Sequence, residues 1–184
     1  MKKITVLLIS VIVLASACGE SEETTESSSQ SDESSSQSEI NSSFTEIEDD
    51  QIFDTEVTDI STGESAPLRT FLTGDKPILV WSWASWCPNC KAEAPGIDQF
   101  AAENPDVIVI GIGSAAELET APGFIEETGV STSEMVWVES TSLWSSLGFT
   151  GRTENLVISS DLTKRSEPTS GFDQTKTEML LKNL

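Results

Sequence analysis

Trp86-Cys87-Pro88-Asn89-Cys90 is the most informative segment of this 184-residue chain. It follows an apolar run, residues 77–83, that predicts a buried strand, and it opens a helical pattern over residues 89–103. Cysteines two residues apart at such a junction are typical of a redox-active dithiol. Cys87 would lie at the helix N-terminus, where unpaired backbone N–H groups and the helix dipole favour an anion. We therefore expect Cys87 to be the attacking thiolate and Cys90 to resolve the mixed disulfide.

A pair of cysteines with this spacing can also form half of a zinc site. A structural zinc ion needs four cysteine or histidine ligands. The chain has no histidine and only three cysteines, and the third, Cys18, lies far away in the sequence. We therefore predict a dithiol/disulfide couple, with no metal ion and no cofactor.

The N-terminus has the pattern of an export signal. Two lysines precede an apolar run, Ile4 to Leu14, which is too short to span a membrane comfortably. We predict a signal peptide over residues 1–17. The sequence Leu14-Ala15-Ser16-Ala17-Cys18 resembles a bacterial lipobox, which implies that Cys18 is diacylated and becomes the mature N-terminus. An ordinary cleavage near Ala17 and an uncleaved anchor are the alternatives.

Each of these alternatives places the working protein outside the cytoplasm, where disulfides are stable. With a lipid on Cys18, the protein would be anchored to the outer face of the cell membrane. Residues 18–45 are rich in Ser, Glu, Thr and Gln and nearly free of apolar side chains, so we expect a disordered tether. The formal net charge of −21 argues against nucleic acid as a partner.

Residues 46–184 alternate strand and helix patterns and have the length of one domain. Alternation over Gln51–Ile60 predicts an edge strand or hairpin, and the continuous apolar run Asp106–Ile112 predicts a strand buried on both faces. A helix is expected over Glu117–Thr128, and a hairpin near Thr163–Pro168. This order predicts an α/β fold: a thioredoxin-like sandwich in which helices flank a central mixed sheet.

The segment Trp86 to Pro95 resembles the active-site stretch of TlpA/DsbE-type thiol-disulfide oxidoreductases, extracytoplasmic members of the thioredoxin superfamily. All fixed positions of their pattern, W-C-x-x-C-K/R-x-E-x-P, are present. The wider similarity covers about residues 53–184 and is strongest to exported single-domain DsbE-like proteins of Gram-positive-type bacteria. Several of those act as oxidants, so the resemblance implies an extracytoplasmic enzyme of this kind.

Glu93 is the third candidate catalytic residue. It lies at helical spacing from Cys90 and Ile97, on an otherwise apolar stripe. A desolvated carboxyl group has a raised pKa and can exchange a proton with Cys90. The alternative is a glutamate whose head group reaches solvent at the rim of the stripe.

Three further residues are predicted to contact substrate: Trp86 beside the sulfur, Pro88 between the cysteines, and Thr153. The family places a cis-proline opposite the dithiol, but this chain has no proline between Pro122 and Pro168, and Thr153 falls at or next to that position. We expect a trans peptide or a rebuilt loop there. The Thr153 hydroxyl is a candidate donor to the Cys87 sulfur, and an ordinary surface threonine is the alternative.

Two classes of function fit these patterns. In the first, the dithiol exchanges disulfides with thiols or disulfides of exported proteins, as an oxidase or, alternatively, as a reductase for cytochrome maturation or repair. A membrane redox partner would recycle it. In the second, the protein is a non-catalytic binding lipoprotein, and Cys87 and Cys90 form a structural disulfide.

Overall fold

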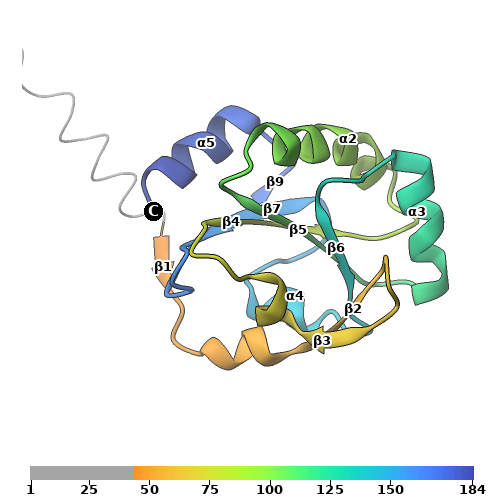
Figure 1. Ribbon diagram of the computed structural model, residues 1–184, viewed down its shortest axis with the longest axis horizontal. Helices are drawn as coiled ribbons and strands as arrows, with labels where there is room; N and C mark the ends of the chain where they lie inside the picture. Colours follow the sequence, from red (N-terminus) through yellow and green to blue (C-terminus); the bar gives the residue numbers. More distant parts are fainter. Residues whose placement is uncertain (1–43) are drawn as a thin grey trace, which may run out of the picture.

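The computed structural model describes residues 44–184, which form one mixed β-sheet between two layers of helices (Figure 1). The strand order is β1-β8-β7-β4-β5-β6-β2-β3, and β9 pairs with β7. The strands are β1 Phe44–Glu46, β2 Glu56–Asp59, β3 Ser65–Pro67, β4 Ile78–Trp83, β5 Ile108–Gly113, β6 Glu134–Trp137, β7 Glu154–Ile158, β8 Lys164–Ser166 and β9 Thr169–Ser170. The predicted thioredoxin-like sandwich with a central mixed sheet is confirmed.

The two continuous apolar runs form the middle of the sheet. β4 pairs in parallel with β5 over its full length, from Ile78 beside Ile108 to Trp83 beside Gly113. All six residues of β4 are buried, as expected for a strand covered on both faces. A Cβ atom added at Gly113 would lie 2.6 Å from the Trp83 ring, so glycine is what allows this tryptophan to lie flat across β5.

The helices divide between the two faces of the sheet (Figure 1). The helices α2 Pro88–Glu103, α3 Ala121–Thr128 and α5 Gln174–Lys182 cover one face. The other face is covered by α4 Ser142–Ser146 and two short 3₁₀ helices, η1 Asp50–Asp54 and η2 Leu68–Phe71. A third 3₁₀ helix, η3 Leu118–Thr120, leads into α3, so the helix expected over 117–128 is split in two.

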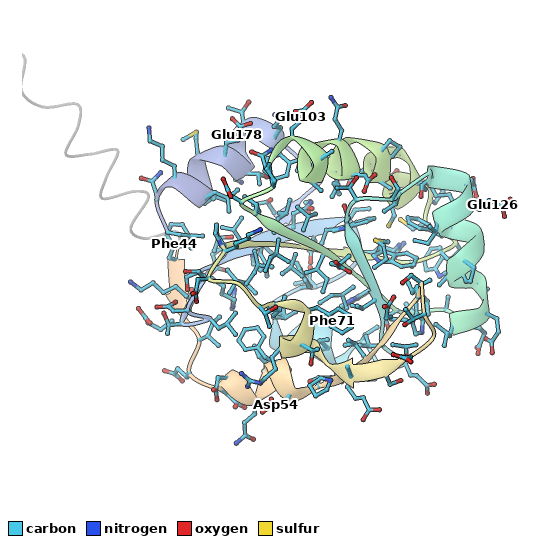
Figure 2. All side chains as sticks on the ribbon, in the orientation of Figure 1. Phe44, Asp54, Phe71, Glu103, Glu126 and Glu178 are labelled. Atoms are coloured by element: carbon cyan, nitrogen blue, oxygen red, sulfur yellow. The ribbon has the colours of Figure 1, made fainter. Side chains whose placement is uncertain are left out.

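Each face has its own apolar core. On the α2 side, Trp81 and Trp83 of β4 pack against Ile97 and Phe100 of α2 and Phe124 of α3. The acidic side chains lie on the opposite, outer surfaces of these helices, as Figure 2 shows for Glu103, Glu126 and Glu178. The amphipathic α2 is thereby fixed against the sheet, with its first turn above the C-terminal end of β4.

Two boundaries differ from those expected. The first half of Gln51–Ile60 is the 3₁₀ helix η1 and not a strand, because the Asp49 carboxylate accepts a hydrogen bond from the Gln51 N–H and begins a helical turn that buries Phe53. Phe44 and Thr45, the last two residues assigned to the tether, belong to β1, which pairs with β8. The predicted signal peptide, Cys18 and most of the tether lie outside the described residues.

Candidate functional site

Cys87 caps the N-terminus of α2. Its backbone is extended, with φ −82° and ψ 114°, and its Sγ accepts a hydrogen bond from the Cys90 N–H at 3.2 Å. Pro88 is the first helical residue, where a missing N–H costs nothing and a fixed φ suits the helix. The sulfur therefore lies where the unpaired backbone N–H groups of the first helical turn point.

The two cysteines differ in access. Cys90 is completely buried, whereas Cys87 is 3% exposed and borders an open cavity of about 310 Å³. The other residues lining that cavity are Pro88, Asn89, Gly151, Arg152 and Thr153. Burial, reinforced by a hydrogen bond with Cys87, raises the pKa of Cys90 to about 12. Cys87 is thus the sulfur that borders the cavity, and Cys90 is a protonated thiol held behind it.

Glu93 lies one turn further along α2, half-buried between that helix and residues 171–172. Burial raises the pKa of its carboxyl group, and a hydrogen bond from the Phe172 backbone opposes this only in part. Its Oε2 atom is buried and has no hydrogen-bond partner among the described residues. The negative charge of Glu93 also contributes to the raised pKa of Cys90, so the two groups interact.

Trp86 stands at the mouth of the site. Its side chain is 51% exposed, unlike those of Trp81 and Trp83 in the core. The indole Nε1 donates a hydrogen bond to the Ala115 carbonyl at 2.9 Å, which fixes the ring. The Arg152 guanidinium stacks on this ring, with Cζ 4.2 Å from the ring centroid.

Thr153 is brought to the dithiol, but its hydroxyl does not bond the Cys87 sulfur. It donates instead to the Arg152 carbonyl, so that part of the sequence hypothesis is wrong. The chain between residues 44 and 184 contains no cis peptide bond, as expected here, and Thr153 adopts a left-handed conformation with φ 64°. Its N–H donates to the Ser82 carbonyl, and its own carbonyl accepts from the Gly171 N–H.

Comparison with known proteins agrees with this geometry. Residues 62–129 match the thioredoxin family model. Over these residues the chain is similar to thioredoxin. MPT53, a soluble secreted antigen of Mycobacterium tuberculosis, is 37% identical over 67 residues, and the thiol:disulfide interchange protein DsbE of Escherichia coli K12 is 34% identical over 58 residues.

These alignments cover only part of each protein: 36% of this chain and 39% of MPT53, and 32% of this chain and 30% of DsbE. The crystal structure of a secreted M. tuberculosis disulfide oxidoreductase homologous to E. coli DsbE superposes with a TM-score of 0.59 at 23% identity. It covers 74% of this chain and all of that one, and it shows that the two share a fold.

Hydrogen bonds hold the Thr150–Glu154 loop against the end of β4. The Ser82 hydroxyl, buried at the end of β4, donates to the Gly151 carbonyl at 2.8 Å and accepts from the Glu154 N–H at 3.2 Å. The Glu154 carboxylate in turn accepts from the backbone N–H and the hydroxyl of Thr150, each at 2.6 Å. These bonds fix the backbone that carries Arg152.

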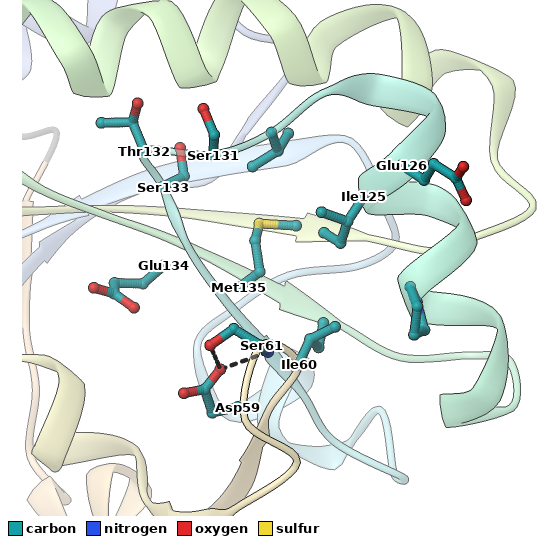
Figure 3. A pocket seen from close by; sticks show the side chains of 12 residues that line it. Asp59, Ile60, Ser61, Ile125, Glu126, Ser131, Thr132, Ser133, Glu134 and Met135 are labelled. Carbon is teal, nitrogen blue, oxygen red and sulfur yellow. Dashed lines mark hydrogen bonds between the residues drawn. The ribbon is translucent and has the colours of Figure 1, made fainter.

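A second cavity, of about 450 Å³, is separate from the one beside the dithiol (Figure 3). It opens between the β2–β3 turn, α3 and the start of β6, and no cysteine lines it. The start of β6 lies level with the middle of β4, because Glu134 pairs with Ile110 and Ile110 with Val80. The Asp59–Ser61 hydrogen bonds drawn in Figure 3 close the turn at its edge.

The structure brings together all six residues expected at the redox site. Cys87, Pro88 and Thr153 line one cavity, Trp86 flanks it, and Cys90 and Glu93 lie behind it on α2. Sequence analysis missed Arg152 and Ser82. Arg152 could have been found because it is next to Thr153 in the sequence. The role of Ser82 depends on its contact with a residue 69 positions away in the chain.

Proposed function

We propose that this protein catalyses thiol–disulfide exchange on exported proteins through Cys87 and Cys90, and that it acts as a disulfide oxidase. The observation that carries the proposal is the hydrogen bond from the Cys90 N–H to the Cys87 sulfur at a helix N-terminus. This sulfur borders an open cavity, whereas Cys90 is sealed behind it. Such an arrangement has one reactive and one resolving thiol.

In the oxidase direction, a substrate thiolate attacks Cys87 Sγ of the oxidised pair. The Cys87–Cys90 bond breaks, a Cys87–substrate mixed disulfide forms, and Cys90 leaves as a thiolate that takes up a proton. A second substrate thiolate then attacks the substrate sulfur of the mixed disulfide. Cys87 leaves as a thiolate, so two electrons pass from the substrate dithiol to the protein.

The reduced site supports this direction. A reduced form that is stabilised makes a dithiol a stronger oxidant. Here the Cys87 sulfur accepts the Cys90 N–H and also interacts with the Cys90 thiol. The hydrogen bond between the two sulfurs exists only in the reduced pair, because a disulfide has no S–H to donate.

Glu93 is the proposed proton carrier for Cys90. A carboxyl group with a raised pKa keeps its proton to a higher pH than an exposed glutamate does, and can deliver it to the leaving Cys90 thiolate. In the reverse direction the carboxylate would accept the proton as Cys90 attacks the mixed disulfide. The buried, unpartnered Oε2 is the atom available for this transfer.

We further propose that the protein works outside the cytoplasm, anchored through a lipid on Cys18 and spaced from the membrane by residues 18–43. The signal-like N-terminus and the lipobox-like sequence support this location. The description of the relative MPT53 as secreted agrees with it. Within residues 44–184, no helix is long and apolar enough to cross a membrane.

The direct test is to equilibrate the Cys87–Cys90 pair against glutathione and to measure its reduction potential. A value above about −200 mV supports the oxidase, and a value near −270 mV, like that of thioredoxin, supports the reductase instead. In parallel, the oxidised protein is mixed with a reduced, unfolded disulfide protein, and disulfide formation is followed by mass. Cys87→Ser is the control, and equal rates with wild type and this variant would overturn the proposal.

A further inference from the structure

Arg152 is an exposed cation at the edge of the cavity that contains the reactive sulfur. Its side chain lies over the Trp86 ring and lines the same cavity as Cys87. The ring is itself held by the Ala115 carbonyl. Stacking on a fixed ring restricts the guanidinium to one side of the cavity but leaves its edge free to donate hydrogen bonds.

The charges around Arg152 leave this cation without an acidic partner. The ion pairs within residues 44–184 use Arg69, Lys91 and Lys164, and none uses Arg152. Lys91 differs from Arg152 in this respect. It directly follows Cys90, but its Nζ forms an ion pair with Oε2 of Glu127 on α3, 2.6 Å away. In a chain of net charge −21, Arg152 is the cation that remains available beside Cys87.

The backbone near Arg152 offers little to a substrate. An extended substrate chain could be held by backbone pairing at Thr153, but the N–H and the carbonyl of that residue are both bonded within the domain. The loop is also fixed by Ser82 and Glu154. Recognition at this edge therefore depends on side chains. Because the loop is already ordered, little conformational entropy is lost when Arg152 binds a substrate.

We propose that Arg152, stacked on Trp86, is a specificity-determining residue that selects substrates with a carboxylate side chain close to the reacting cysteine. This inference rests on the proposed function. A carboxylate can accept two parallel hydrogen bonds from the guanidinium edge while the neighbouring substrate sulfur meets Cys87. An exposed ion pair of this kind gives a preference of about two- to fivefold over a neutral side chain.

The test uses three peptide disulfides that differ at one position. Each is a symmetric dimer of a peptide with blocked ends and one cysteine, flanked by Glu, Gln or Lys. The reduced protein converts each dimer into two peptide thiols while Cys87 and Cys90 form their disulfide, so two electrons leave the protein. The rate of thiol release is measured by mass after an acid quench. We expect rates in the order Glu, Gln, Lys for wild type.

Arg152→Gln is expected to bring the Glu-to-Gln rate ratio to about one, and Arg152→Glu to reverse the order so that Lys is fastest. Lys176→Gln removes another exposed cation, on α5, and is expected to keep the wild-type ratio. A ratio near one for wild type, or an unchanged ratio in Arg152→Gln, overturns the inference. If the oxidised protein forms no disulfide in a reduced, unfolded protein faster than Cys87→Ser does, the proposed function itself fails, so the two failures are distinguishable.

Cystine is a further test substrate, because its carboxylates belong to the amino acid itself. It distinguishes a preference for small carboxylate-bearing disulfides from a preference for carboxylate side chains of proteins. Suppose that cystine reacts faster than the Gln peptide but the Glu peptide does not. Small carboxylate-bearing disulfides would then be selected and proteins would not, which contradicts the proposal. Raising the salt concentration is expected to reduce the Glu-to-Gln ratio of wild type, because an exposed pair is screened.

Discussion

Two loops meet at the redox cavity, and they are built in different ways. Residues 84–90 place Cys87 by local means: a strand end, one turn closed by the Cys87 N–H on the Ala84 carbonyl, and the first turn of α2. The Thr150–Glu154 loop is held by Ser82, 69 residues earlier in the chain, and by the Gly171 N–H. The first loop supplies the chemistry, and the second supplies the surface next to it.

The difference separates reactivity from recognition. The N–H group that bonds the sulfur belongs to its own helix, and any sequence that starts a helix there provides it. The position of Arg152 depends instead on buried hydrogen bonds of Ser82 and on the ring of Trp86. We therefore expect substitutions in the first loop to change how fast exchange occurs, and those around the second to change which substrates are exchanged.

The largest effect is expected from Cys87→Ser, which should reduce exchange to the uncatalysed background because the other described thiol, Cys90, is buried. Cys90→Ser should still form a mixed disulfide with substrate but fail to release it. For both variants, exchange is stopped with acid, and protein–substrate adducts are identified by mass spectrometry. An adduct on Cys90 in the Cys87→Ser variant would contradict the assignment of roles.

Glu93→Gln should slow resolution of the mixed disulfide by about 10²-fold, the lower range for loss of a general acid or base. Resolution is measured by stopped-flow tryptophan fluorescence between pH 5 and pH 9. Glu103→Gln, on the exposed side of the same helix, is the matched control and should leave the profile unchanged. A Glu93→Gln profile identical to that of wild type would refute the proton transfer.

Glu93→Gln should also differ from wild type in how its stability depends on pH. Burial raises the pKa of the Glu93 carboxyl group in the folded protein. The stability that Glu93 contributes is therefore fully present below its unfolded pKa, and it is lost as pH rises through the folded value. Glu93→Gln lacks this loss, so its stability relative to wild type in urea unfolding should increase from pH 4 to pH 8.

Ser82→Ala should destabilise the domain by about 1–3 kcal/mol, because it removes a buried hydroxyl and leaves the Gly151 carbonyl and the Glu154 N–H without it. It should also lower the preference for the Glu peptide. Ser85→Ala removes the other buried hydroxyl near the site, which bonds Thr120, and should keep that preference. Equal preferences in the two variants would mean that the second loop is not fixed by Ser82.

The smallest effect on exchange is expected from Asp98→Asn, far from the dithiol. The Asp98 carboxylate accepts the N–H groups of Ser131, Thr132 and Ser133. Burial acts to raise its pKa, but these donors outweigh it and the net pKa is lowered. Its contribution to stability is therefore present above the unfolded pKa and is lost as pH falls through the folded value.

Asp98→Asn should accordingly cost about 1–3 kcal/mol at neutral pH and less below pH 3. It should leave the exchange rates within error of wild type. Urea unfolding at several pH values and the peptide assay measure the two effects separately. A change in exchange with Asp98→Asn would show that this contact between α2 and residues 131–133 is coupled to the dithiol.

Much of the fold could be predicted from the sequence. The runs that became β4 and β5 are apolar without a break, which only a strand covered on both faces explains. The α2 pattern and its start at the dithiol were equally clear. The pattern over residues 51–60 misled because Phe53 and Val57 are both buried, one from a 3₁₀ helix and the other from a strand, so alternation did not distinguish them.

The local sequence was sufficient for the reactive centre, because a strand, a CPNC turn and a helix start bring Cys87 and its N–H donors together within a few residues. It also indicated Glu93, one turn away on the same helix. Only the tertiary structure decided that Thr153 is bonded within the domain and that Arg152 lies on Trp86. Those contacts join residues distant in the chain, and no periodicity or spacing encodes a contact that exists only after the sheet has assembled.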